Sequence, residues 1–297
     1  MQTSSVLTFG KSAQDVLQSG EGKVYAVFDN TAYLKSNWLD PGLCCIGTGT
    51  LCKGPLNITV DSFTSNRLKR NDIWFYKNHC LTIAGCQPVE VTSASIWQPL
   101  DVLIVGETRD RTFSKSIKTV ESVTASHAVV DYTAQPTSTE HRTSIRLNEG
   151  MQILESWLRV TNGQTPVPDK LTRLLGCGAG LTPAGDDIIA GALITTVALK
   201  QTTVAENLTI WVKQRAPSLT SKISYAHLLA ACDGAGVEFL HQFIYSVLNA
   251  SDNQNTVEHS ARRLCNYGSS SGYYALLGAM VVFRSLSKDQ PLYDAYF

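Results

Sequence analysis

Residues 188–199 carry no charged side chain, and they directly follow two adjacent acids, Asp186 and Asp187. A helix that is apolar on every side is buried inside a domain. The run is too short to span a bilayer, which needs about 20 residues. Thr182 and Pro183 favour a helix start, because a threonine hydroxyl can cap free amides and proline has no N–H to lose. The sequence therefore predicts a buried central helix over residues 182–200.

The composition places this helix in a folded protein with few charges. The 297 residues include 25 Lys+Arg and 25 Asp+Glu, so the formal net charge is zero, and 17% of the residues are charged. A sequence pI of about 7.0 argues against a nucleic-acid binder, which needs a basic surface. An apolar content of 43% with so few charges argues against disorder. We expect no nucleic-acid partner and no membrane partner.

The N-terminus and the cysteines indicate a cytoplasmic protein. Residues 1–20 contain no basic segment followed by an apolar core, so we expect no signal peptide. The eight cysteines form no CxxC pair, which favours reduced thiols. Two interpretations of the N-terminal cysteines remain open. They are small buried residues of strands, which we favour, or they form a metal site from Cys44, Cys45, His79, Cys80 and Cys86.

The two halves of the chain differ in periodicity. Short runs rich in Val, Ile, Thr and aromatic residues predict strands at 24–28, 43–46, 56–60, 73–76, 89–96, 102–105 and 128–132. A polar segment, 133–143, looks like a connection. Apolar residues at three- and four-residue steps then predict helices near 148–161, 182–200, 203–214, 221–232, 235–249, 255–265 and 270–286.

This order predicts an α+β protein. Its N-terminal domain, 1–147, is expected to be mainly antiparallel β. Its C-terminal domain, 148–297, is expected to be all-helical with buried central helices.

A glycine-rich loop leads into the central helix. Glycines at 176, 178 and 180 give a flexible backbone that can present N–H groups to an anion at a helix N-terminus. The helix dipole accounts for one acid in the first turn. A second adjacent acid should face the packed interior, where a carboxylate needs a metal, a cation or an amide donor. The loop is not a Walker A loop, because Asp186 and Asp187 stand where Lys and Ser/Thr belong. No βαβ pattern surrounds it, which excludes a dinucleotide fold.

Two further helix starts carry polar residues. Residues 268–272 read Gly-Ser-Ser-Ser-Gly and match G-x-S-x-G with Ser270 in the nucleophile position. Neither a preceding strand nor a following histidine is present, so we do not expect a serine hydrolase. Either the serines hold an anion or they are ordinary helix caps. Residues 220–227 open another helix, in which Ser224 is a candidate inward polar contact. His227 and His241 lie among apolar residues and are expected in the core.

These segments together resemble a bacterial family of oxamate carbamoyltransferase subunits, linked to allantoin degradation and purine catabolism. The similarity rests on Gly-Leu-Thr-Pro-Ala-Gly-Asp-Asp (180–187), Ser-Lys-Ile-Ser (221–224), and Ser-Ser-Gly (270–272) ahead of Leu-Leu-Gly (276–278). The resemblance implies a multi-subunit transferase that interconverts oxalurate plus phosphate with oxamate plus carbamoyl phosphate. It also implies two partner subunits, one of them similar to acyl-CoA synthetases.

The chain departs from the family pattern at two places. Ala184 stands where the family usually has serine, and Tyr273-Tyr274 stands where it favours Trp-Asp. A different amide or ureido acid is therefore an open alternative for the substrate.

The resemblance and the loop chemistry together predict a site. Asp186 and Asp187 are the predicted catalytic residues; they could accept hydrogen bonds from a carbamoyl NH2 or hold Mg2+, the one cofactor considered. The predicted ligands of the substrate and its anionic group are Gly178, Gly180, Thr182, Gly185, Ser224, Ser269, Ser270, Ser271 and Gly272. Donors aimed at a phosphate and at a developing oxyanion are what carbamoyl transfer needs. Two other functions stay open: a non-catalytic scaffold or regulatory subunit, and a metal-dependent amide hydrolase that uses the aspartate pair.

Overall fold

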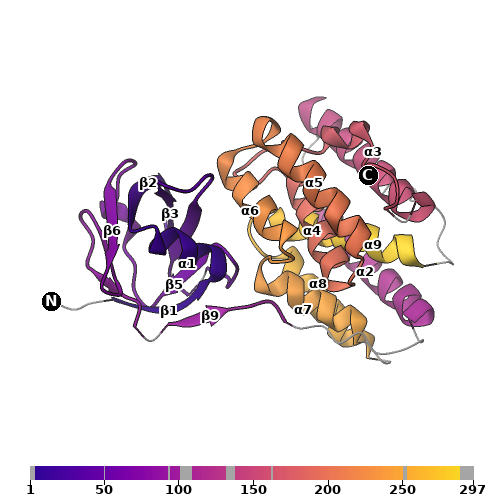
Figure 1. The fold of residues 1–297 in the computed structure, drawn as a ribbon. Helices are drawn as coiled ribbons and strands as arrows, with labels where there is room; N and C mark the ends of the chain where they lie inside the picture. Colours follow the sequence, from indigo (N-terminus) through magenta and orange to yellow (C-terminus); the bar gives the residue numbers. More distant parts are fainter. Residues whose placement is uncertain are drawn as a thin grey trace. The chain divides into compact units, whose positions relative to one another are not determined.

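The computed structural model describes residues 4–49, 51–92, 94–100, 109–131, 138–161, 163–249 and 253–287. It divides the chain into two compact units, Met1–Pro99 and Leu100–Phe297 (Figure 1). In the described residues the first unit holds strands and one α-helix, and the second is helical. The mixed α+β class is therefore confirmed.

The first unit contains nine strands among its described residues. They are β1 Ser4–Gly10, β2 Glu21–Val27, β3 Thr31–Ser36, β4 Leu43–Gly47, β5 Asn57–Val60, β6 Ile73–Lys77, β7 Cys80–Ile83, β8 Val89–Glu90 and β9 Ser95–Trp97. Their order in the sheet is β5-β4-β3-β2-β6-β7-β8-β1-β9, and an additional pairing of β1 with β5 closes the first eight into a barrel.

The domain is mainly antiparallel, as expected, but its strands close into a barrel that includes parallel pairs, which was not expected. β1 is parallel to β8 and to β9, and β4 is parallel to β5, whereas the other pairs are antiparallel. β1 lies in a segment where no strand was predicted, and the predicted strand at 56–60, which contains β5, gave no indication of its partners. Closure depends on partners about 50 to 90 residues apart, such as Val6 with Val60 and Ser4 with Val89.

The barrel core is apolar and includes two of the cysteines. Trp74, Leu34 and Ile58 are fully buried, and helix α1 (Lys11–Gln18) buries Ala13, Val16 and Leu17 against the strands. Cys44 and Cys45 are buried in β4, as expected for small apolar residues. Across the described residues no group of three or more His, Cys, Asp or Glu is arranged to hold a metal.

The second unit consists of helices packed around one core. They are α2 Arg109–Asp131, α3 Ser138–Thr161, the 3-10 helix η2 Asp169–Arg173, α4 Ala184–Ala198, α5 Thr202–Leu219, α6 Lys222–Cys232, α7 Glu238–Leu248, α8 Gln254–Cys265 and α9 Ser271–Leu286. Helices α3 to α9 overlap the seven predicted positions. No helix among the described residues is both long and apolar enough to cross a membrane.

Two expectations near the start of this unit are wrong. Residues 128–131, predicted as a strand, form the end of α2, and residues 138–143, predicted as a connection, form the start of α3. The β-branched pair Val129-Val130 suggested a strand, but Ile117, Val120 and Val123 are buried at three-residue steps along a helix. The predicted strand 102–105 and residues 132–137 lie outside the described residues. The division between the units falls at residues 99 and 100, ahead of the expected boundary at 147, which lies inside α3.

Helices α4 and α9 form the centre of this unit (Figure 1). α5 and α6 pack on α4, whereas α2, α3 and α8 pack on α9. The two central helices approach so closely that a Cβ atom on Gly278 would lie 2.0 Å from the Ile188 carbonyl oxygen. A Cβ on Gly191 would lie 2.0 Å from the Ala275 carbonyl oxygen. Glycine is therefore required at both positions, and it fixes how one helix sits on the other.

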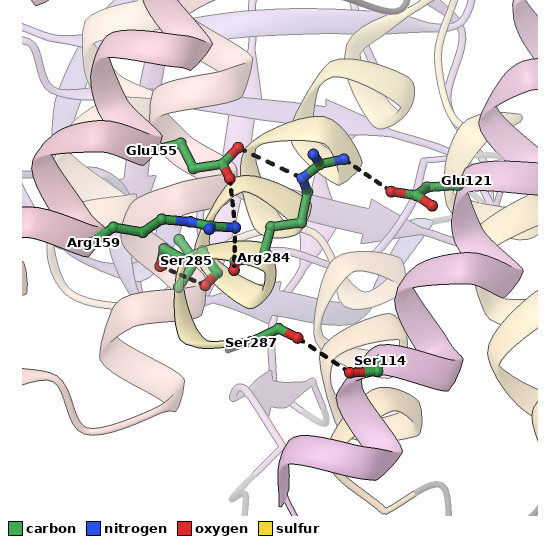
Figure 2. Close-up of polar contacts among 8 residues, drawn as sticks. Ser114, Glu121, Glu155, Arg159, Arg284, Ser285 and Ser287 are labelled. Atoms are coloured by element: carbon green, nitrogen blue, oxygen red, sulfur yellow. Dashed lines mark hydrogen bonds and ion pairs between the residues drawn. The ribbon is translucent and has the colours of Figure 1, made fainter. Parts of the chain in front are cut away.

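The far end of α9 is held by buried ion pairs (Figure 2). Arg284 Nη1 lies 2.8 Å from Glu121 Oε1 on α2, and Arg284 Nε lies 3.5 Å from Glu155 Oε2 on α3. Arg159 pairs with Glu155 at 2.9 Å and donates to the Arg284 carbonyl at 3.0 Å. Because Glu155 is fully buried, the pairing supplies the opposite charges that a buried carboxylate needs.

Candidate functional site

The loops that precede α4, α6 and α9 contact one another. The hydroxyl oxygens of Thr182 and Ser271 lie 2.8 Å apart, which joins the starts of α4 and α9. The Ser221 hydroxyl, at the N-cap of α6, donates to the Leu181 carbonyl at 2.9 Å. Three helix N-termini therefore meet at residues 181–182, and their dipoles favour an anion there.

The hydroxyls of Thr182 and Ser270 are not used as helix caps, whereas the Ser221 hydroxyl caps α6 by accepting a hydrogen bond from the Ser224 N–H at 3.0 Å. α4 begins at Ala184 with Pro183 at the N-cap, so the predicted capping by Thr182 is wrong. Ser270 is the N-cap of α9 and its side chain makes no capping hydrogen bond. Thr182 instead donates to Asp187 Oδ2 at 3.3 Å. The hydroxyls of Thr182 and Ser271 thus contact each other and Asp187 rather than helix amides.

The glycine-rich loop leaves backbone donors available. Gly178 and Gly180 have φ angles of 116° and 99°, in the left-handed region that favours glycine. In the described residues, no acceptor is found for the N–H groups from Gly178 to Thr182. A Cβ on Gly180 would meet nothing within 4 Å, so the loop is open there. Successive amides in such a turn can bind an anion.

Two predicted ligands, Gly185 and Gly272, are packed against backbone instead. A Cβ on Gly185 would lie 2.0 Å from the Leu174 carbonyl oxygen, and one on Gly272 would lie 1.9 Å from the Leu264 carbonyl oxygen. Their N–H groups already donate, to Cys177 at 2.9 Å and to Tyr267 at 3.1 Å. These glycines allow close packing beneath the site.

Asp186 is buried and fully engaged with donors. Its Oδ1 accepts from the Gly176 N–H at 2.9 Å, and its Oδ2 accepts from the hydroxyls of Ser224, at 2.6 Å, and Thr220. Burial raises the pKa of Asp186, and the bonds from Ser224, Thr220 and Gly176 offset part of that rise. The carboxylate ties the glycine-rich loop to the start of α6. Ser224 therefore contacts Asp186, and a cation at Asp186 would have to displace these donors.

Asp187 points to the other side, toward α9. Its side chain is partly exposed, and it contacts Thr182 and Ser271. Burial raises the pKa of Asp187 well above its ordinary value, and the neighbouring Asp186 carboxylate raises it further, whereas hydrogen bonds from Ser271 and Thr182 lower it. The raised pKa means that this carboxyl group keeps its proton to a higher pH than a free aspartate does.

The structure thus separates the two predicted catalytic acids. It brings together Thr182, Asp187 and Ser271, and it places Ser269 and Ser270 on the adjoining turn, with Ser269 exposed. Sequence reasoning missed Gly176 and Thr220 as partners of Asp186. The signal available for Thr220 was its position directly before the serine N-cap of α6. That position does not reveal that its hydroxyl contacts Asp186, 34 residues earlier in the chain.

Of the two histidines expected in the core, one is buried and the other, His227, is partly exposed. His241 is buried, and its Nε2 accepts a hydrogen bond from the Gly236 N–H at 3.0 Å. Burial lowers the pKa of both His227 and His241 to about 4. Both imidazoles are therefore neutral near neutral pH, and neither contacts the Thr182–Asp187–Ser271 group through a described hydrogen bond.

Comparison with known proteins identifies one relationship. Residues 174–283 match the family model of the oxamate carbamoyltransferase subunit AllH. The match begins beside the glycine-rich loop and includes α4 to α8 and most of α9, so the resemblance seen in the sequence is confirmed over this segment. No curated protein and no solved structure matches the chain.

Proposed function

We propose, from the family match over residues 174–283, that this chain is a subunit of a carbamoyltransferase that interconverts oxalurate plus phosphate with oxamate plus carbamoyl phosphate. The observation that carries the proposal is the meeting of three helix N-termini at Leu181 and Thr182, beside a carboxyl group with a raised pKa. Other subunits of the transferase complete the enzyme.

The proposed anion site consists of the loop 178–182 and the turn 269–271. The loop amides and the hydroxyls of Thr182 and Ser271 donate to the phosphate or carboxylate group of the substrate. Their arrangement at helix starts also favours an oxyanion that develops on the carbamoyl carbon. Gly185 and Gly272 support this site by close packing and have no direct contact with the substrate.

Asp187 is the proposed catalytic acid. When phosphate attacks the ureido carbon of oxalurate, a carbon–oxygen bond forms and the bond to the oxamate nitrogen breaks. That nitrogen must gain a proton, which a neutral Asp187 can donate, and the proton lost by the attacking phosphate returns the carboxyl group to its neutral form. Asp186, by contrast, is a positioning residue, because its oxygens are occupied by Gly176, Thr220 and Ser224.

Two tyrosines at the start of α9 differ from the family pattern and bear on which substrate is accepted. Tyr273 is buried and its ring packs edge-to-face with that of Tyr274 at 5.3 Å, where the family favours Trp-Asp. Tyr274 is partly exposed next to Ser271. We propose that this ring takes the place of the family's polar contact, so that a related ureido acid is accepted in addition to oxalurate.

The experiment is phosphate-dependent formation of carbamoyl phosphate from oxalurate by the complex assembled from this chain and its partner subunits. Asp187→Asn should reduce the turnover rate by about 100-fold or more, the size of a lost general acid. Asp169→Asn serves as the matched control, since Asp169 is exposed and pairs with Arg215. Unchanged turnover with Asp187→Asn in an assembled complex would favour the scaffold role, and cleavage of oxalurate that needs a divalent ion but no phosphate would favour the metal-dependent hydrolase.

A further inference from the structure

One mouth of the barrel contains a cavity separate from the α4–α9 site. Four strand ends meet there: β1 and β8 begin and β5 and β7 end, as their pairing directions require. The loops after β5 and β7 enclose a volume of about 330 Å³. Barrel mouths are common ligand sites, and pockets for small molecules start at about 300 Å³.

The lining combines one cation with neutral donors and an apolar wall. Of the described residues around the cavity, Arg67 is the charged one, and Ser62, Thr64 and Gln87 supply neutral polar groups. Phe63 and Ile83 supply the apolar wall. In the described part of the chain no ion pair involves Arg67. The guanidinium is thus a positive group beside a concave space, with hydroxyl and amide groups close to it.

Cys86 also lines the barrel-mouth cavity. Its sulfur lies 3.8 Å from the Thr64 carbonyl oxygen. Burial raises the pKa of Cys86; Asp72 raises it further and Arg67 lowers it, which places the guanidinium near the sulfur. Asp72 does not line the cavity, and it accepts a hydrogen bond from the Lys69 N–H at 2.7 Å.

We propose that the barrel-mouth cavity is a binding site for a small organic carboxylate that carries a hydroxyl or oxo group. The carboxylate pairs with the Arg67 guanidinium, whose planar fork matches two carboxylate oxygens. The hydroxyl or oxo group bonds to Ser62, Thr64 or Gln87. The remaining carbon atoms contact Phe63 and Ile83, so that one ligand uses all three parts of the lining.

The test is calorimetric titration of the full chain with lactate, 2-oxoisovalerate and mandelate. Mandelamide is the neutral match for mandelate, and inorganic phosphate is the second source of an anion. We expect at least one acid to bind, and mandelamide to bind about tenfold or more weakly than mandelate, because it lacks the charge-assisted pair. Absence of binding by all three acids overturns the proposal, as does tighter binding of phosphate than of every acid.

Two further measurements locate the ligand. Arg67→Gln should weaken binding of the acid about tenfold or more, whereas Arg70→Gln, which changes an arginine stacked on Tyr25 outside the cavity, should leave the Kd unchanged. The bound acid should slow alkylation of Cys86 but not that of Cys80, which is also partly exposed. Equal effects of the two arginine variants, or no protection of Cys86, would place the ligand elsewhere. Because the site uses none of the residues proposed for catalysis, Asp187→Asn should bind the acid as the parent chain does.

Discussion

The hydroxyl oxygens of Thr182 and Ser271 lie 2.8 Å apart, although the two residues are 89 positions apart in the sequence. The contact joins the two polar segments that the sequence singled out. It also brings both hydroxyls to Asp187. The two segments therefore form one group of polar side chains at the crossing of two central helices.

This contact predicts coupled effects on anion binding. Thr182→Val and Ser271→Ala should each weaken binding of inorganic phosphate to the assembled enzyme, and the double variant should show a coupling free energy of about 0.5–1.5 kcal/mol. Titration of all four proteins measures it. Ser285→Ala, at the other end of α9, is the matched control, because among the described residues its hydroxyl bonds within its own helix, to the Val282 carbonyl. Strictly additive effects would show that the hydroxyls do not act together.

The raised pKa of Asp187 predicts that the free energy of unfolding falls as the pH rises. Because burial raises its pKa, the native state keeps a proton that the unfolded chain has already released above the ordinary value of 3.8. The free energy of unfolding should therefore decrease with pH from about 4 upward, until the native carboxyl group also ionises. Asp187→Asn should remove this part of the dependence. Urea titrations between about pH 4 and about pH 8 measure it, and an identical slope in both proteins would contradict the prediction.

For Asp186, which accepts three hydrogen bonds, we expect that substitution lowers the stability of the fold. Asp186→Ala leaves the Gly176 N–H and the hydroxyls of Thr220 and Ser224 without their acceptor. Unsatisfied buried donors should lower the free energy of unfolding by about 1–3 kcal/mol. Thermal and chemical unfolding measure the loss, with Asp169→Ala as the exposed control. If the Asp186→Ala protein retained its stability, a direct contact of Asp186 with the substrate would be favoured instead.

The crossing of α4 and α9 predicts intolerance of a single methyl group. Gly278→Ala would place a Cβ 2.0 Å from the Ile188 carbonyl oxygen, so the helices must separate. The expected cost is about 1–3 kcal/mol of unfolding free energy, together with reduced activity, because the two polar helix starts lose their alignment. Gly49→Ala has free space and should stay within about 0.5 kcal/mol.

The buried ion pairs predict a large difference between two similar pairs. Arg159–Glu155 and Arg262–Glu258 have the same i,i+4 spacing and the same 2.9 Å distance, but Glu155 is fully buried and Glu258 is not. Arg159→Ala removes the i,i+4 partner of the buried Glu155 and should cost about 3–5 kcal/mol. Arg262→Ala should cost less than about 1 kcal/mol. Chemical unfolding compares them, and equal losses would show that the buried cluster is solvated.

The sequence predicted which segments of the C-terminal part form helices, but not which side chains of separate helices contact one another. The uncharged run 188–199 predicted a buried helix, and most residues of α4 are buried, with Asp187, Ala190, Val197 and Ala198 partly exposed. Apolar residues at three- and four-residue steps predicted the positions of α5 to α9. This pattern could not show that Asp186 faces Thr220 and Ser224 while Asp187 faces Ser271, since that depends on how separate helices pack.

The barrel escaped prediction for a related reason. Each strand is short, and β3 (TAYLKS) and β7 (CLTI) carry too few residues for alternation to be recognised. Closure depends on which distant edges pair, and short strands encode their register weakly. In the α2 segment, local β-branched residues favoured a strand, but tertiary burial at helical spacing determined the structure.

The pairing of β1 has a consequence for synthesis on the ribosome. β1 leaves the ribosome first, yet one of its edges needs β5 and the other needs β8 and β9, which end at Trp97. β1 can pair with β5 once residue 60 has emerged, but its other edge stays unpaired until β8 and β9 follow, and until then that edge can join another nascent chain. Translation that slows before residue 97 should therefore increase aggregation, whereas a pause placed after it should not.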